Sequence, residues 1–216
     1  MERADIRTGR PSKEQAGALG DYVLTVADAL FIENGYGATS MATVAARARV
    51  GKQTLYRRFP DKAALFREVI RRRIDSIAMT PTDDIASRTP LDELKKMGRA
   101  ALGIVLDPEF VRLYRIIIAE ALPFPELACA ASDYWGSNFK GRCIDAIREA
   151  QAMQICRPGD SQTLAQCFLW SLIGEAFLMG LSGQKCLVYE GGRDAHIERV
   201  LQIILGGSSV EYSRKG

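Results

Sequence analysis

Apolar residues recur every three or four positions through almost the whole chain, and this spacing constrains the fold more than any other feature. Leu19, Val23 and Leu30 lie on one such stripe, which Gly35 and Gly37 end. The spacing places apolar side chains on one side of an α-helix. We find no stretch of alternating apolar and polar residues between turn signals, which a half-buried strand would require. The sequence therefore predicts an all-α protein of about nine helices.

Capping residues predict where several helices begin and end. Thr39 or Ser40 can cap a short helix, and Asp61 can cap a further helix that begins directly after Asp61. Gly183 is expected to stop a long apolar helix that Asp160 caps. The later helices are predicted at Leu91–Leu106, Phe110–Leu122, a stretch ending near Ile155, Asp160–Leu181 and Ala195–Leu205.

The segment MTPTDDIASRTP, at 79–90, carries prolines and no periodicity, which is typical of a linker. It divides the helical pattern into two domains. The predicted organisation is a flexible basic arm at 1–12, a first domain at 13–79, a linker at 80–90, a second domain at 91–206 and a polar tail at 207–216.

Charge is unevenly distributed along the chain. Residues 1–79 hold 14 Lys and Arg against 9 Asp and Glu, a net charge of +5, whereas residues 80–216 hold 15 against 17, a net charge of −2. The basic first third favours an anionic partner there, such as nucleic acid. Many solvated surfaces carry a similar charge, so this indication needs a motif beside it.

Several other classes are disfavoured. The polar start and the mixed composition of 164–181 indicate neither a secretory signal nor a membrane span, and we expect a cytoplasmic protein. Nothing in the sequence near the single histidine, His196, suggests a catalytic triad, and we find no paired-carboxylate motif. We therefore expect no enzyme. We expect no metal or other cofactor, because the five cysteines form no CxxC pair. Buried reduced thiols are the simplest interpretation, with a redox sensor as the alternative.

In the stretch VGKQTLYRRFPDK, at 50–62, Leu55 and Phe59 lie four residues apart among a dense polar set. With about 100° between successive residues, Leu55, Phe59 and Gly51 fall on one side of a helix. Gln53 and Arg57 fall at the centre of the opposite side, flanked by Thr54 and Tyr56. A helix at 41–48, a three-residue turn and this second helix are the elements of a helix-turn-helix motif, whose second helix enters the DNA major groove.

The polar side chains suit that groove. Gln53 can pair with adenine, Arg57 or Lys52 with guanine, and Thr54 can touch a thymine methyl group or a phosphate. Tyr56 and Lys62 can bind phosphates, and Arg10 lies in a Gly-Arg-Pro segment suited to the minor groove. The alternatives are a merely charged surface helix and a disordered tail. The full predicted set of DNA contacts is Arg10, Thr39, Arg49, Lys52, Gln53, Thr54, Tyr56, Arg57 and Lys62.

The segment TSMATVAARARVGKQTLYRRFPDKAALF, at 39–66, resembles the DNA-binding domain of the tetracycline-repressor (TetR) family of bacterial regulators. Residues 112–127, RLYRIIIAEALPFPEL, are similar to the effector domain of its AefR-like subgroup. Two departures stand in the turn, where Arg49 replaces the usual glycine and Gly51 the usual Ser or Thr cap. The resemblance implies that 13–79 binds DNA and that 91–206 binds an effector and dimerises.

What the resemblance implies for function is a ligand-responsive regulator, expected to be a repressor. A homodimer would bind a near-palindromic operator through an interface of four helices, two from each copy, at about 160–182 and 193–206. Gly174, Ala176 and Gly180 would permit close approach there, although small residues also suit packing within one chain. A helical enzyme and a helical carrier that binds no DNA remain the alternatives.

The expected effector is small and hydrophobic or aromatic, bound between residues 91 and 155. Candidate contacts fall on stripes of three successive helices, and the alternative is that these residues simply fill a core. They are Met97, Ala101, Val105, Phe110, Tyr114, Ile117, Trp135, Phe139 and Cys143. Arg115 could orient an anion from the rim. Glu175, in an apolar stretch, could reach solvent, pair across a dimer or face a ligand.

Overall fold

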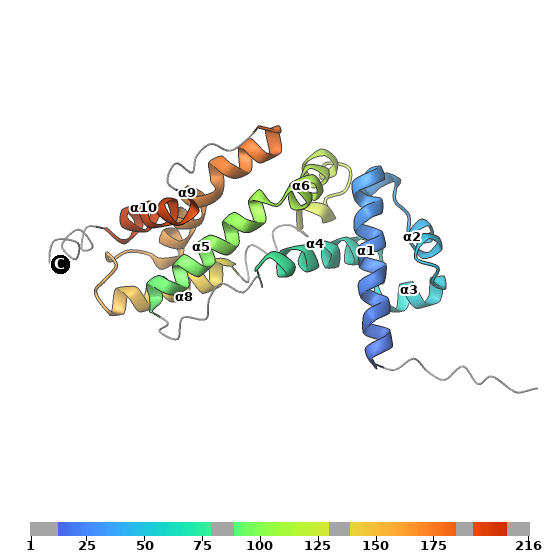
Figure 1. Ribbon diagram of the computed structural model, residues 1–216, viewed down its shortest axis with the longest axis horizontal. Coiled ribbons are helices and arrows are strands. Elements are labelled where there is room, and N and C mark those ends of the chain that lie inside the picture. Colours follow the sequence, from blue (N-terminus) through green and yellow to red (C-terminus); the bar gives the residue numbers. More distant parts are fainter. Residues whose placement is uncertain (1–12, 79–88, 130–138, 185–191, 207–216) are drawn as a thin grey trace, which may run out of the picture. The chain divides into compact units, whose positions relative to one another are not determined.

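The computed structural model describes residues 13–78, 89–129, 139–184 and 192–206. All regular structure in those residues is helical, as the spacing of apolar residues predicted (Figure 1). The chain divides into two compact units, Met1–Val69 and Ile70–Gly216. The division falls inside one helix, before the linker that the sequence suggested at 80–90. The predicted arm at 1–12 and tail at 207–216 lie outside the described residues.

The first unit contains α1 (Lys13–Ala38), α2 (Met41–Arg47), α3 (Lys52–Arg58) and the first part of α4 (Lys62–Ala78). Three aromatic rings form the centre of its core. Phe66 of α4 packs edge-on against Phe31 and Tyr36, with ring centroids 5.0 and 5.3 Å apart. This cluster joins the start of α4 to the end of α1 and so fixes the frame on which α2 and α3 pack.

A glycine and a buried side chain stabilise the corner between α1 and α2. Gly35 leaves the helical conformation at φ 80°, a left-handed value that favours glycine. The hydroxyl of Thr39 donates to the carbonyls of Leu30 (3.2 Å) and Gly35 (2.8 Å), and its side chain is buried. Thr39, which was predicted to contact DNA, therefore stabilises the corner between α1 and α2. Ser40 is the cap of α2, because its hydroxyl accepts a hydrogen bond from the Thr43 amide at 3.0 Å.

Lys62 also faces this corner. Its ammonium donates to the carbonyl of Tyr36 at 2.8 Å and lies 4.2 Å from the centroid of the Tyr36 ring. A cation at the carboxyl end of a helix meets carbonyls that have no partner within that helix. The amine that the sequence assigned to a DNA phosphate is thus engaged within the fold.

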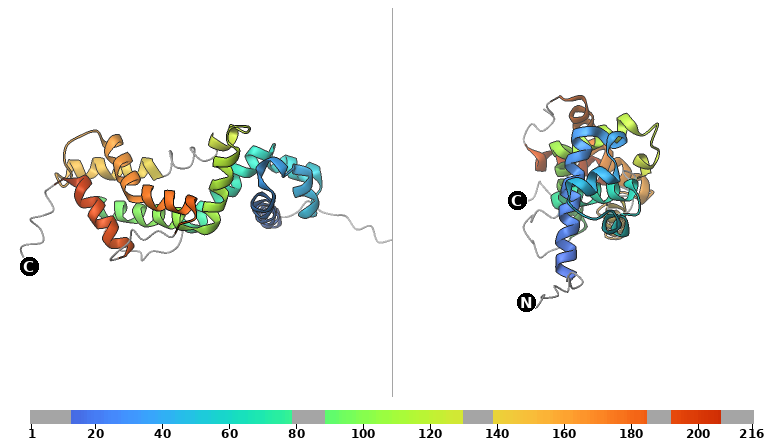
Figure 2. Two further views of the ribbon diagram at one scale, coloured as in Figure 1. Left: turned by 90° about the horizontal axis from the view of Figure 1, so that it is seen from above. Right: turned by 90° about the vertical axis from the view of Figure 1, so that its right-hand side faces the viewer.

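The second unit consists of the rest of α4 with α5 (Pro90–Leu106), α6 (Pro108–Glu120), α8 (Gly141–Ala152), α9 (Ser161–Ser182) and α10 (Arg193–Leu205). Helix α5 contacts α6, α8, α9 and α10, and the views in Figure 2 show it running beside α8 and α9. At Gly98 the side chains of α9 and α10 come close to α5, because a Cβ there would lie 3.1 Å from the Leu172 side chain and 3.3 Å from that of Ile197.

Three caps predicted in this unit are present, while the helix bounds differ from the predicted ones by up to three residues. Asp107 accepts from the Phe110 amide at 2.7 Å and Asp160 from the Thr163 amide at 2.8 Å. The Thr163 hydroxyl, which donates to Asp160 at 2.6 Å, and the Thr163 amide hold the pKa of the Asp160 carboxyl below its usual value. Gly183 ends α9 in the left-handed conformation, at φ 78°.

Helix α9 is long and apolar enough to cross a membrane, with a mean hydropathy of 1.5 over its most apolar window. In the structure it is a core helix. Nine of its residues, including Phe168, Leu172 and Ala176, are buried in the second unit. The sequence interpretation of a buried helix agrees with this packing.

The contacts of Lys62 predict a loss of stability when its amine is removed. Lys62→Met is expected to lower the free energy of unfolding by about 1–2 kcal/mol, because the Tyr36 carbonyl loses a charged donor and the ring loses its cation. Denaturant unfolding followed by circular dichroism measures this change. Lys52→Met, at an exposed position, is the control and should stay within about 0.5 kcal/mol. Equal effects in both variants would contradict a structural role for Lys62.

Candidate nucleic-acid interface

The turn between α2 and α3 contains a strained residue. Arg49 adopts φ 54°, the left-handed region, and its side chain is exposed. A non-glycine residue there costs roughly 1–2 kcal/mol. The amide of Val50 donates to the Ala45 carbonyl at 3.0 Å, so the turn closes in spite of that strain.

Gly51 caps α3 with its backbone alone. Its φ and ψ of −63° and 139° place it outside the helix, and no side chain caps α3 there. Gly51 is exposed, whereas the helical projection placed it inward. The projection failed because it continued the helical rotation into a residue that is not helical.

Helix α3 has two unlike sides. Leu55 (2% exposed) and Phe59 are buried in the first unit, as predicted. Lys52, Gln53 and Arg57 are exposed, Tyr56 is 48% exposed and Thr54 is half-buried. The two apolar residues therefore anchor a short helix, and the polar set stays accessible on its other side.

The predicted DNA contacts thus separate into three groups. Arg49, Lys52, Gln53, Thr54, Tyr56 and Arg57 come together on the turn and α3. Thr39 and Lys62 are engaged at the corner of α1, and Arg10 lies outside the described residues.

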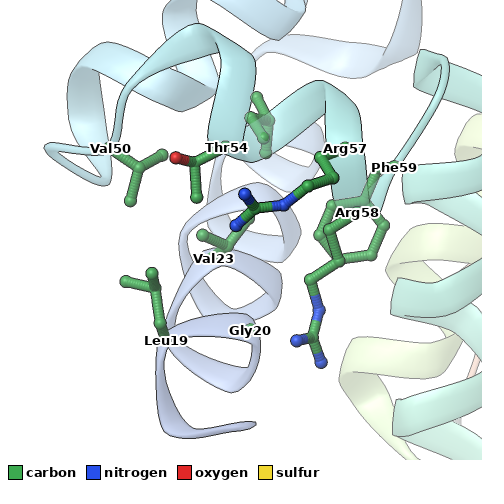
Figure 3. Close-up of a pocket in the computed structure, with 9 residues that line it drawn as sticks. Leu19, Gly20, Val23, Val50, Thr54, Arg57, Arg58 and Phe59 are labelled. Atoms are coloured by element: carbon green, nitrogen blue, oxygen red, sulfur yellow. The ribbon is translucent and has the colours of Figure 1, made fainter. Parts of the chain in front are cut away.

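Arg58 belongs beside this surface, although sequence reasoning passed over it. Its guanidinium lies against the backbone of α1 at Gly20, where a Cβ would fall 2.1 Å from the guanidinium carbon. Figure 3 shows Arg57 and Arg58 extending from α3 on the side of Gly20 and Val23. The signal was a glycine inside the apolar stripe of α1, which indicates a close approach of another group.

The residues predicted to bind an effector lie mostly within the core of the second unit. Tyr114 is half-buried, its ring packs edge-on against Phe177 at 4.7 Å, and burial raises the pKa of its hydroxyl. Trp135 lies outside the described residues. The buried members are Met97, Ala101, Val105, Phe110, Ile117, Phe139 and Cys143.

Arg115 does not face an effector site with a free guanidinium. It donates to the carbonyls of Gly180 (2.8 Å) and Leu181 (3.0 Å), where α9 ends. Arg115, which was predicted to orient an anion at the rim of the effector site, therefore caps the carboxyl end of α9.

The cysteines differ in environment. Cys143 and Cys156 are buried, and burial raises the pKa of the Cys143 thiol to about 12, which makes it unreactive. Cys129 and Cys167 are exposed, so burial does not describe all of these thiols. Within the described residues, no three His, Cys, Asp or Glu side chains gather as a metal site would require.

Helices α9 and α10 keep large apolar side chains exposed. Trp170 is 59% exposed and Leu178 67% on α9, and Ile203 is 72% exposed on α10. Glu175 is exposed on α9 as well, so its charge is not buried in the core of this unit. His196 meets the Leu172 carbonyl at 3.0 Å, which ties α10 to α9.

Two family models match the chain. Residues 23–69 match the bacterial regulatory proteins of the tetR family, and residues 92–207 match the C-terminal domain of AefR-like transcriptional repressors. The matched segments correspond to the α1–α4 region and to α5–α10.

Two solved structures of regulators are similar to this chain as well. The Flavonoid-responsive Regulator FrrA is 30% identical, with a TM-score of 0.70 over 88% of this chain and 96% of that one. A TetR family regulator from Pseudomonas syringae pv. tomato is 25% identical, with a TM-score of 0.61 over 86% and 94%.

A curated relative is the HTH-type transcriptional activator FasR of Mycolicibacterium smegmatis, 33% identical over 97 residues. That alignment spans 45% of this chain and 41% of FasR, less than half of either. The families and relatives matched are transcriptional regulators and not enzymes. The chain belongs to the TetR family of bacterial transcriptional regulators, and its second unit is an AefR-like C-terminal domain.

Proposed function

We propose that this protein is a cytoplasmic, ligand-responsive repressor that binds a near-palindromic operator as a homodimer. The observation that carries the proposal is the two-sided α3, with Leu55 and Phe59 buried and the polar residues accessible. A helix held in this way presents side chains to the major groove without losing its anchor. The repressor assignment follows the family of its second unit, described as repressors.

The exposed residues divide by chemistry into base readers and phosphate binders. Gln53, Lys52 and Arg57 carry the donors and acceptors that pair with adenine or guanine edges. Tyr56 and Arg49 suit phosphates, which fix the register of the helix but do not read sequence. An exposed arginine at a strained turn position is consistent with a contact that offsets the strain.

Arg57→Ala is expected to weaken binding to a selected operator by about 1–3 kcal/mol and to relax base preference at one position. The reason is the loss of a bidentate contact, measured by fluorescence anisotropy on operator and on mixed DNA. Tyr56→Phe should instead weaken both DNAs evenly. Arg67→Ala removes the same charge from an exposed position of α4 and is the control. Unchanged operator affinity in Arg57→Ala would refute this register of α3.

A second copy of the chain is the proposed partner of α9 and α10. Trp170, Leu178 and Ile203 leave apolar area exposed that a dimer would bury. Two recognition helices must also lie roughly 34–36 Å, or a multiple of one DNA turn, apart to fill successive major grooves. One copy has one such helix, so a palindromic site requires two copies.

Leu178→Glu is expected to raise the dimer dissociation constant by about tenfold or more, because a charge replaces an apolar side chain at the proposed interface. Sedimentation should show the wild type near twice the 23.8 kDa chain mass. Ile118→Glu places the same charge on an exposed residue of α6 and should remain dimeric. A wild-type monomer that binds its operator tightly would contradict the proposal.

The proposed effector is a small hydrophobic or aromatic molecule bound between α5, α6 and α8. The candidate residues are packed in this structure, so binding must favour a second conformation in which they part. Tyr114 offers the polar handle, because it is half-buried and next to Phe177. FrrA is named as flavonoid-responsive, which makes flavonoids a reasonable first panel for this chain.

A flavonoid that releases operator DNA is expected to do so at least about tenfold less well on Tyr114→Ala, through loss of aromatic area and of the hydroxyl. Calorimetry measures binding and anisotropy measures release over the same concentrations. Ile118→Ala, on the exposed side of α6, should respond as the wild type does. A full response in Tyr114→Ala would place the effector elsewhere.

A further inference from the structure

The guanidinium of Arg58 packs against the backbone of α1 at Gly20, on the edge of a hollow between α1 and α3 (Figure 3). A Cβ at residue 20 would lie 2.1 Å from the guanidinium carbon, so any side chain there would displace Arg58. The same carbon lies 5.9 Å from the centroid of the Phe59 ring, within the range of a cation–π contact. Arg58 therefore joins the last turn of α3 to α1, and it has an interaction partner within the fold.

The hollow beside this contact has a volume of about 240 Å³, and its wall includes Val23 of α1 with Thr54 and Arg57 of α3. Leu55 and Phe59 anchor one side of α3 and leave this space open. Groups around a cavity relax partly into it when a contact beside it is removed. A helix of seven residues next to such a space therefore needs a further contact to hold its last turn at a fixed distance from α1.

We propose that Arg58 is a positioning residue for DNA recognition, which fixes the last turn of α3 through its packing on Gly20 and thereby places Arg57. Arg57 directly precedes Arg58, so a shift of this turn moves both side chains. Paired hydrogen bonds to a guanine edge need donor–acceptor distances of about 2.7–3.2 Å, so a small displacement of Arg57 weakens them. This consequence rests on the proposed base-reading role of Arg57, whereas the placement of α3 by Arg58 does not.

An arginine at the end of a recognition helix could instead bind a DNA phosphate. Such a contact would strengthen binding to all sequences and increase its salt dependence, but it would not change base preference. The packing favours the positioning role, because the Arg58 guanidinium lies against α1 and is engaged within the fold. Gly20→Ala separates the two roles, since it keeps the charge of Arg58 and changes only where that charge lies.

Gly20→Ala in the full-length protein is the test variant. It should fold, because alanine favours a helix over glycine, and its Cβ meets only the end of a flexible side chain, which moves away. Preference for a selected operator over mixed DNA, measured by fluorescence anisotropy, is expected to fall at least about fivefold, as for one poorly read base pair, with an unchanged salt slope. Gly17→Ala, where a Cβ meets nothing within 4 Å, is the control and should keep the wild-type preference.

Arg58→Ala supplies a second variant. Alone it is expected to lower operator preference as Gly20→Ala does. In the Arg58→Ala background, Gly20→Ala should have no further effect, because the guanidinium that the Cβ displaces is absent. Additive losses would overturn the proposal. A smaller salt slope with full base preference in Arg58→Ala would make Arg58 a phosphate ligand and overturn it as well.

Amide NMR shifts of Thr54 and Arg57, recorded without DNA, distinguish failure of this proposal from failure of the proposed function. They are expected to move in Gly20→Ala and to stay in place in Gly17→Ala. Unmoved shifts, or equal operator preference in the two variants, would overturn the proposal. Moved shifts in a protein without operator preference would refute the proposed function instead and would support the placement of α3 by Arg58.

Discussion

The burial of Leu55 and Phe59 is the interaction on which the proposed DNA-binding surface depends. Helix α3 has seven residues, far fewer than the roughly 12–15 that an isolated helix needs to be even marginally stable in water. Its conformation therefore comes from docking on the first unit. The orientation of Gln53 and Arg57 follows from the same docking, since a helix held by one side can present only the other. Stability and recognition are thus coupled through two apolar side chains.

Local rules predicted most of the fold, and long-range contacts account for what they missed. Asp107, Asp160 and Gly183 act within three or four residues of themselves, so their caps were visible in sequence. Lys62 meets a carbonyl 26 positions away, and Thr39 one nine positions away. Residue type alone suggested DNA for both, because their partners inside the fold are not apparent from spacing.

Helix α9 illustrates a different limit of sequence reasoning. Apolar residues of α9 occur all around the helix axis, so its sequence pattern shows no polar side that would separate core from surface. The structure resolves this ambiguity: Phe168 and Leu172 are buried against the neighbouring helices, whereas Trp170 and Leu178 are exposed. A helix with one apolar side buried and another exposed suits a protein that packs its own core and meets a second copy, which is why the proposed dimer surface falls here.

The turn before α3 breaks two local rules within three residues. Arg49 holds a left-handed backbone that costs roughly 1–2 kcal/mol. Gly51 gives α3 no side-chain cap, a loss of a few tenths of a kcal/mol against serine. The Arg49 side chain is exposed and contributes no buried surface in return. We propose that a DNA phosphate bound by the Arg49 guanidinium offsets this strain, a charged contact for which a glycine has no side chain.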